Sequence, residues 1–350
     1  MTATTMKDVA AAVGVSTATV SNAYNRTGRV SEAVRARVLA VAEELGFAGP
    51  DPAGIALRTG RAGAIGVLFS TPLPYAFGDP YCSAMLMGVA EVAQRCRSGV
   101  WLMPLVRHSD GLDAAGRGES MEVVRRAAVA GVLADGIADD NPALAVLSAR
   151  GVPVVRSVDT AGGRCVVIDD YGAARTVGEH LAALGHRRVA VLLDADPADP
   201  DKLFVYARLR LAGLRAGLGH HARVVAVSAG DNSRGSGSAA AGRLLDGGRR
   251  PSAIAAVSDV LALGALDALK ERGLRAGVDV SVTGFDDLPS AGEAGLTTVR
   301  QPIQEKGQLM ARMLLEPDFD QRRIELPTQL IIRASTGATR PRLHRGVTGV

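Results

Sequence analysis

The sequence predicts an α/β protein in which three short N-terminal helices precede a larger core of two Rossmann-like lobes. Residues 5–46 show helical periodicity, with a capping residue before each helix and glycine after the first and the third. The chain changes character near residue 60, after a stretch rich in glycine and proline. From residue 64 onward, apolar runs of strand length alternate with amphipathic stretches of helix length. This alternation is typical of parallel sheets that carry helices on both faces.

Length and composition indicate a soluble protein that works inside the cell. The 350 residues allow two or three folding units with a sizeable core. No apolar run approaches the ~20 residues that a membrane-spanning helix needs, and residues 1–8 lack the basic start and apolar stretch of a secretion signal. Cys82, Cys96 and Cys165 form no C-x-x-C pair, which fits a reducing compartment and argues against structural zinc. We therefore expect a cytoplasmic protein without membrane contact.

The charge balance permits a nucleic acid as partner and restricts its form. A net charge of +4 is compatible with an acidic polymer, although an ordinary solvated surface explains it equally well. Aromatic residues make up 3% of the chain, which is too few to build rows of stacking platforms for single strands. If the protein binds nucleic acid, we expect a duplex.

The first two predicted helices are separated by a very short turn. Thr5 can cap the first helix, Asp8 stands at its third position as in a capping box, and Gly14 ends it. Ser16 caps a second helix that runs over residues 17–25. Two helices joined in this way form a helix-turn-helix, whose second helix can enter the major groove of DNA. A generic helical bundle is the alternative.

The third predicted helix begins after the cap Ser31 and ends at Gly46. One small core shared by the three helices is predicted from apolar residues at helical spacing: Val9, Ala10, Val13, Val20, Ala23, Tyr24, Val34, Val38, Val41 and Leu45. The residues of the second helix that face away from this core are Thr17, Ala18, Ser21 and Asn22. In a helix-turn-helix, this exposed face would read bases.

The run from Met6 to Asn22, M-K-D-V-A-A-A-V-G-V-S-T-A-T-V-S-N, resembles the DNA-binding headpiece of the lactose-repressor/galactose-repressor family of bacterial transcription regulators. Its D-V-A, G-V-S and T-V-S triplets have the family's spacing, and Val30-Ser31 and E-E-L-G-F at 43–47 follow. The resemblance implies that Thr17, Ala18 and Asn22 read base edges. It implies phosphate contacts for Thr5, Ser16, Thr19, Ser21, Asn25 and Arg29. Asn22 stands where the family frequently has arginine, and Asn pairs well with adenine.

Residues 50–61 read as a short helical element between the headpiece and the core. Asp51 can cap it, Pro52 suits its first position and Gly60 closes it. A helix shorter than about 12 residues is marginal in water, so this element should fold only on a partner. It resembles the family's hinge helix, which pairs with its dimer mate in the minor groove, and Leu57 matches the leucine that wedges between central base pairs. A plain linker with an incidental leucine is the alternative, which Gly54 supports.

Strand-like apolar runs recur through the core in two sets. The first set comprises residues 64–69, 100–105, 131–133, 152–157 and 166–168. The second set comprises residues 189–193, 224–227, 253–256 and 280–283, and it alternates with helices expected to begin near Tyr171, Tyr206, Ser236 and Asp259. Two sets imply two lobes, and ligands bind such sheets at the carboxyl ends of the strands. We therefore expect a ligand cleft between the lobes.

The core also resembles the family's effector-binding domain, which is of the periplasmic-binding-protein-like type. The matching segments are D-D-Y-G-A at 169–173, H-L-A-A-L-G-H at 180–186, R-L-A-G at 210–213, Ser258-Asp259, G-F-D-D at 284–287 and L-T-T-V-R-Q-P at 296–302. The resemblance implies effector contacts for Tyr81, Asp159, Arg210, Ser258, Asp286 and Gln301, with Asp159 the weakest of these assignments. Asp accepts hydrogen bonds from two hydroxyls and Arg donates a fork of them, so this set favours a small polyhydroxylated ligand. The alternatives are a surface arginine on a helix for Arg210 and a turn aspartate for Asp286.

The predicted domain boundaries follow from these patterns. The headpiece covers residues 1–49, the hinge 50–61 and the core 62–335. Within the core, lobe 1 is expected to cover about 62–168 and 303–319, and lobe 2 about 169–300 and 320–335. Residues 336–350, with several arginines among Gly, Pro and Thr, are expected to be a disordered tail.

No catalytic motif stands out. The glycine-rich residues 230–238 lack the Gly-Lys-Ser/Thr of a phosphate loop, and no Gly-x-Ser-x-Gly elbow is present. We therefore expect no enzyme, cofactor or metal, but an effector-responsive repressor that binds a palindromic DNA operator as a homodimer or a tetramer made of two dimers. A solute-binding protein, or an enzyme on the same two-lobed core, is the alternative.

Overall fold

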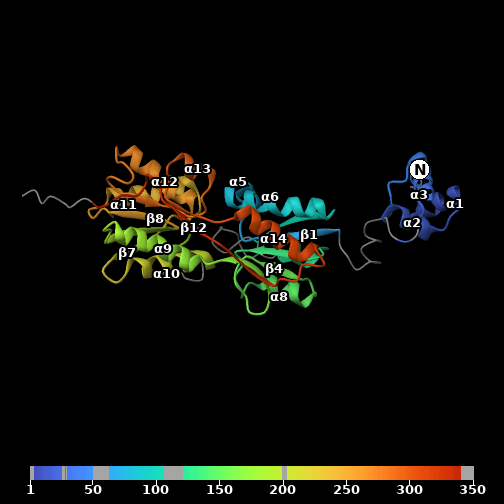
Figure 1. Ribbon diagram of the computed structural model, residues 1–350, viewed down its shortest axis with the longest axis horizontal. Helices are drawn as coiled ribbons and strands as arrows, with labels where there is room; N and C mark the ends of the chain where they lie inside the picture. Colours follow the sequence, from blue (N-terminus) through green and yellow to red (C-terminus); the bar gives the residue numbers. More distant parts are fainter. Residues whose placement is uncertain are drawn as a thin grey trace, which may run out of the picture. The chain divides into compact units, whose positions relative to one another are not determined.

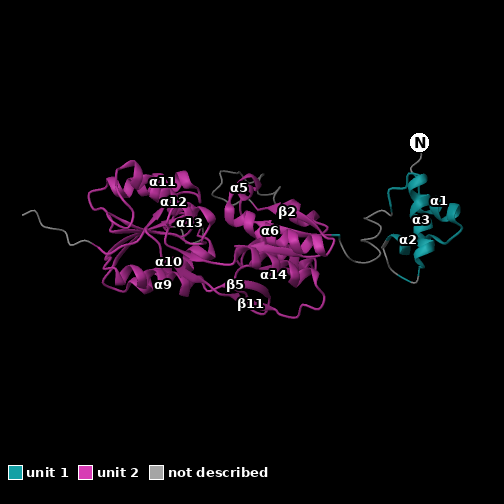
Figure 2. Ribbon diagram, turned by 45° about the horizontal axis from the view of Figure 1, so that its top comes forward, with its two compact units in different colours: residues 1–63 teal, residues 64–350 magenta. Residues whose placement is uncertain are grey.

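The computed structural model describes residues 4–25, 28, 30–49, 63–105, 121–198 and 203–339. They divide into two compact units, with the boundary after Gly63 (Figure 2). The expected hinge helix with Leu57, the expected phosphate contact Arg29, the side chain of Asn25 and the tail from residue 340 lie outside the described residues. Within the described ranges, no helix is both long enough and apolar enough to cross a membrane.

The first unit contains α1 (Met6–Val13), α2 (Thr17–Asn25) and α3 (Glu32–Glu44), so the three predicted helices are confirmed (Figure 1). The backbone N of Thr5 donates to Asp8 Oδ2 at 2.8 Å, and Ser16 Oγ accepts from the backbone N of Thr19 at 3.1 Å. Gly14 ends α1 with a φ of 75°, a conformation that only glycine adopts cheaply.

The core of this unit follows the predicted spacing, with one exception. Val9, Val20 and Val38 are fully buried, but Leu45 is 41% exposed. The third helix ends at Glu44, so helical spacing no longer directs the side chain of Leu45 toward the core. Ala42, one turn after Val38, is buried instead.

The first lobe of the second unit is built on a six-stranded parallel sheet of order β11-β5-β4-β3-β1-β2. Its strands are β1 (Ala64–Phe69), β2 (Gly99–Pro104), β3 (Val132–Asp135), β4 (Val154–Arg156), β5 (Arg164–Ile168) and β11 (Arg323–Leu326). Its helices include α5 (Leu73–Gly78), α6 (Pro80–Arg95), α8 (Pro142–Ala149) and α14 (Ile303–Leu315).

The second lobe is built on a four-stranded parallel sheet of order β7-β6-β8-β9. Its strands are β6 (Arg188–Leu193), β7 (Arg223–Ser228), β8 (Ala253–Ala256) and β9 (Ser281–Thr283). Its helices include α9 (Asp170–Ala183), α10 (Val205–Leu218), α11 (Arg234–Asp246), α12 (Asp259–Glu271) and α13 (Pro289–Glu293). A small antiparallel pair, β10 (Thr298–Arg300) and β12 (Gln329–Ile331), completes it. The predicted α/β class with parallel sheets is thereby confirmed.

The lobe boundaries expected near the C-terminus need two corrections. β11 pairs in parallel with β5, with Leu326 opposite Ile168, so this strand extends the first sheet although residues 320–335 were expected in lobe 2. The expected disorder from residue 336 is also wrong for residues 336–339. The backbone N of Gly337 donates to Ser281 Oγ at 3.0 Å and that of Thr339 to the carbonyl oxygen of Leu184 at 2.9 Å, which fixes this segment on the second lobe.

Glycines allow the paired helices of each lobe to approach closely. A Cβ atom at Gly213 of α10 would lie 2.1 Å from the carbonyl oxygen of Tyr171, and one at Gly217 would lie 2.0 Å from that of Arg175. Both distances are far shorter than an atomic contact permits, so α10 can pack on α9 only because these residues lack side chains.

Candidate functional site

A cavity of about 410 Å³ lies at the carboxyl ends of strands from both sheets, which is the expected position of the ligand cleft. Ser70 after β1 and Asp135 of β3 line it from the first lobe, and Asp194 after β6 and Ser258 after β8 line it from the second. A ligand held here would contact both lobes at once.

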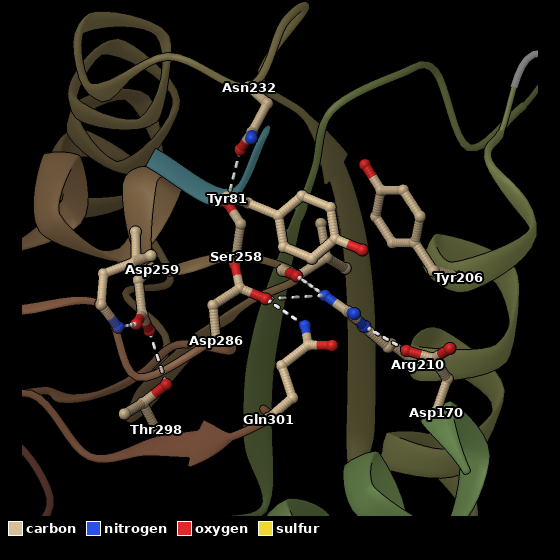
Figure 3. A network of polar contacts seen from close by, with 12 residues as sticks. Tyr81, Asp170, Tyr206, Arg210, Asn232, Ser258, Asp259, Asp286, Thr298 and Gln301 are labelled. Atoms are coloured by element: carbon tan, nitrogen blue, oxygen red, sulfur yellow. Dashed lines mark hydrogen bonds and ion pairs between the residues drawn. The ribbon is translucent and has the colours of Figure 1, made fainter. Parts of the chain in front are cut away.

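Arg210 occupies the second-lobe wall of this cavity and is 8% exposed (Figure 3). Its Nε donates to Asp170 Oδ1 at 2.7 Å and one terminal nitrogen donates to the carbonyl oxygen of Val257 at 2.6 Å. Its guanidinium carbon lies 3.5 Å from the centre of the Phe285 ring. Burial opposes its charge, but Asp170 and Asp286 together raise the pKa of Arg210. The alternative of a solvated surface arginine is thereby excluded.

Asp286 faces Arg210 across 3.8 Å from an unusual backbone conformation. Its φ is 118°, a region that residues other than glycine rarely adopt. Two hydrogen bonds hold it there: its backbone N donates to the carbonyl oxygen of Val299 at 2.8 Å, and Gln301 Nε2 donates to its Oδ1 at 2.6 Å. Burial raises the pKa of Asp286 well above its ordinary value. Gln301 therefore orients the side chain of Asp286 and does not itself line the cavity.

Asp259 holds the loop that carries Asp286 through two hydrogen bonds. It is fully buried, accepts from Thr298 Oγ1 at 2.5 Å, and accepts from the backbone N of Leu288 at 2.8 Å. Burial raises the pKa of Asp259 to about 7, although both hydrogen bonds favour the charged form. Its side chain thus ties the loop after β9 to β10, and it fixes the backbone that presents Asp286.

Tyr81 and Ser258 line the cavity from opposite lobes. Tyr81 Oη lies 3.3 Å from Asp135 Oδ1 and 3.4 Å from Lys306 Nζ. Ser258 caps α12 and donates from its Oγ to Asn232 Oδ1. Tyr81, Arg210, Ser258 and Asp286 are thus brought together around one cavity.

Asp159 is not brought to this cavity. Its side chain is 62% exposed and forms a salt bridge with Arg323 at 3.0 Å. The hydrogen bond from Arg323 lowers its pKa. After β4 the chain turns so that Ser157 and Val158 line the cavity, and Asp159 then lies on the outer surface.

Several lining residues were missed from the sequence: Tyr75, Asp79, Asp170, Asp194, Phe204, Tyr206 and Asn232. Asp170 stands in the D-D-Y-G-A segment, and Tyr206 at an expected helix start, so both carried a signal. Phe204 and Tyr206 stack with ring centroids 5.2 Å apart, and Tyr206 Oη donates to Asp194. Tyr75 and Asn232 come from segments without a motif.

The second candidate site is the outer face of the helix-turn-helix. Thr5, Ser16, Thr17 and Ala18 are exposed, and Thr19 and Asn22 are half-buried. Ser16 Oγ and Thr19 Oγ1 lie 2.9 Å apart and share one hydrogen bond. Ser21 is only 2% exposed, so the structure does not present its side chain to a phosphate as the resemblance implied. Among the described residues, this face therefore offers small polar and apolar groups.

Comparison with known proteins agrees with this architecture. Residues 5–49 match bacterial regulatory proteins of the lacI family, and residues 178–336 match the periplasmic binding protein-like domain. An HTH-type transcriptional regulator of Mycolicibacterium smegmatis is 35% identical over 341 residues, covering 89% of this chain and 90% of the relative. The chain belongs to the lacI family.

Solved structures support the same assignment for this lacI-family regulator over nearly its full length. The lac repressor dimer bound to operator and the anti-inducer ONPF shares 28% identity at a TM-score of 0.77, covering 96% of this chain and 100% of that one. The complex of the transcriptional regulator CelR with cellobiose shares 29% identity at a TM-score of 0.66, covering 95% and 99%. The protein is a helix-turn-helix transcription regulator with a periplasmic-binding-protein-like core.

Proposed function

We propose that this lacI-family regulator represses transcription in the cytoplasm by binding a palindromic operator as a homodimer, and that a neutral sugar or related polyol in the cleft controls it. The observation that carries the effector part is the array of Arg210, Asp170 and Asp286 on the cavity wall. A single helix-turn-helix makes too few contacts for a specific operator, whereas two related by symmetry match two half-sites. The lac repressor, a relative, is a dimer on its operator.

The charges of the cleft favour a ligand rich in hydroxyl donors over an anion. Among the described lining residues, seven aspartates face only two cations, Arg210 and Lys306. Arg210 is already held by Asp170 and the Val257 carbonyl, and Lys306 contacts the hydroxyl of Tyr81. Carboxylates accept from sugar hydroxyls and repel phosphate or carboxylate groups. The aromatic rings of the lining add apolar surface for the C–H face of a sugar.

The proposed control couples this cleft to DNA through the relation between the lobes. A ligand that contacts both lobes favours one arrangement of them, and the two chains of a dimer then hold their DNA-binding units at one spacing. Such coupling is reciprocal, so an effector that weakens operator binding tenfold is itself bound tenfold more weakly by the operator complex.

The test is selection of binding sites from a random duplex library by the purified full chain at near-physiological salt, without ligand and with a panel of neutral sugars. We expect a palindrome with a flexible pyrimidine–purine step at its centre. Recovery of no palindrome under any of these conditions would refute the proposal. A single unrepeated half-site would refute the homodimer, because the described part of each chain carries one helix-turn-helix.

A further inference from the structure

Among the described residues, two hydrogen bonds cross the cleft directly from one lobe to the other, and both involve Asn232. Tyr75 Oη, on α5 of the first lobe, donates to the carbonyl oxygen of Asn232 at 2.9 Å. Asn232 Nδ2 donates to Asp79 Oδ2, between α5 and α6, at 3.2 Å. Tyr75 Oη also lies 3.2 Å from the same oxygen of Asp79. Asn232 itself belongs to the second lobe, in the segment that joins β7 to α11.

Each end of this contact is anchored to a helix. Asp79 is 6% exposed, and its other oxygen accepts from the backbone N of Cys82 at 2.9 Å, which caps α6. Asn232 Oδ1 accepts from Ser258 Oγ, and Ser258 in turn caps α12 by accepting from the backbone N of Leu261 at 3.2 Å. The chain of contacts therefore joins the first turn of α6 in one lobe to the first turn of α12 in the other. Figure 3 shows its second-lobe part, from Asn232 to Ser258.

The chemistry of the three residues fits a lasting contact. Burial, and the neighbouring carboxylate of Asp79, raise the pKa of Tyr75, so its hydroxyl keeps its proton and remains a donor. A bond between an amide and a buried carboxylate is stronger than one between neutral groups. Asp79 and Asn232 both line the cavity, so the contact forms part of its wall.

We propose that Tyr75, Asp79 and Asn232 form an inter-lobe clasp that holds the two lobes together through contacts within the protein itself. Asn232 is the positioning residue of the clasp, since its amide meets Asp79 of the first lobe and Ser258 of the second. The consequence for operator binding rests on the proposed function, because the clasp selects the lobe arrangement that an effector then stabilises or disrupts.

The test reverses the direction of the central hydrogen bond. Asn232→Asp places a second carboxylate against Asp79 and should separate the lobes, while it keeps the acceptor for Ser258. Asp79→Asn in the same chain restores a donor–acceptor pair, and Asn caps a helix as well as Asp does. Tyr75→Phe removes the other crossing hydrogen bond while it keeps the ring.

Lobe separation is measured by electron–electron resonance between spin labels on Ala145→Cys of α8 and Ala239→Cys of α11, both exposed. Cys96→Ser removes the partly exposed native thiol, since Cys82 and Cys165 are buried. Labelled full-length chain is diluted with an excess of unlabelled chain, so that the measured pairs lie within one chain.

We expect one narrow distance without ligand, a longer and broader distribution for Asn232→Asp and for Tyr75→Phe, and recovery of the narrow distance in the Asp79→Asn/Asn232→Asp chain. An unchanged distribution in Asn232→Asp would overturn the clasp. So would failure of the double replacement to restore the distance, because the single change would then act by damaging the loop. The measurement uses neither operator nor effector, so it decides the clasp separately from the proposed function.

Discussion

Replacement of Arg210 by methionine tests whether the cavity wall is an electrostatically coupled unit. Methionine keeps much of the length and apolar contact of the arginine stem over Phe285 but removes every donor. Asp170 and Asp286, whose side chains are 14% and 6% exposed, then lose their cation. The carbonyl oxygen of Val257 also loses its donor at 2.6 Å.

The expected cost follows from burial. Removal of one partner from a buried ion pair destabilises a protein by about 3–5 kcal/mol, because the remaining charge is buried without compensation. At pH 8 we expect Arg210→Met to lower the free energy of unfolding of the core by about this amount. Arg210 lowers the pKa of Asp286 in the native chain, so the variant raises that pKa further. A raised carboxyl pKa favours the folded state at low pH, so the cost should be smaller at pH 5 than at pH 8.

The assay is urea unfolding of the full chain, followed by circular dichroism at pH 8 and pH 5. Arg234→Met is the matched control, because Arg234 pairs with Asp267 on the surface, with side chains 58% and 36% exposed. An exposed pair of this kind contributes at most about 1 kcal/mol. A loss below about 1 kcal/mol for Arg210→Met, or an equal loss at both pH values, would refute the assigned coupling.

Three further predictions follow from the same structure. Burial raises the pKa of Asp259 to about 7, so its protonated form stabilises the fold at pH 4 and this stabilisation is lost as the pH rises toward 7. The free energy of unfolding should therefore fall by about 1.4 kcal/mol per pH unit in this range, and Asp259→Asn should remove this dependence in urea unfolding measured at several pH values. An unchanged pH dependence in the variant would contradict the prediction. Gly217→Ala should destabilise the core by roughly 1–3 kcal/mol, because its Cβ would lie 2.0 Å from the carbonyl oxygen of Arg175. Gly235→Ala in α11 is the control, because no described atom lies within 4 Å of the new Cβ, and it should be neutral or stabilising by up to ~1 kcal/mol in thermal unfolding. An equal loss of stability in both variants would argue against close packing as the cause. Asn22→Ala should remove about 1–3 kcal/mol of the binding preference for one base pair of the operator, measured by anisotropy titrations with operator variants. A uniform loss of affinity for all sequences would instead mean that Asn22 contacts phosphates.

The headpiece could be predicted almost element by element because its signals are local. Thr5 and Ser31 precede α1 and α3 as expected, and Gly14 ends α1, since a cap acts within one turn of the chain. The predicted burial of Leu45 was wrong, because helical spacing does not show where the last turn of a helix ends. The strands of the core were predicted for the same local reason, and β1 and β8 have the expected bounds.

The cavity could be predicted only in part. Tyr81, Arg210, Ser258 and Asp286 reach it, and the resemblance to the family had implied these four residues. The residues that contact these four side chains could not be predicted, because each contact depends on two segments far apart in the sequence. Tyr75 and Asn232, which are 157 residues apart, illustrate this most clearly.

The sequence by itself determined the class of protein, the helix ends of the headpiece, the alternation of strands and helices, and four of the side chains that reach the cavity. The helix ends and the alternation depend on periodicity and caps, whose physical causes lie within a few residues, whereas the class and the four side chains were implied by the resemblance to the family. Only the tertiary structure decided that β11 joins the first sheet, that residues 336–339 pack on the second lobe, that Asp159 faces outward and that Asn232 links the lobes. Each of these depends on which distant segment supplies the hydrogen-bond partner, and a strand edge or an amide accepts many partners until the sheets and helices around it are in place.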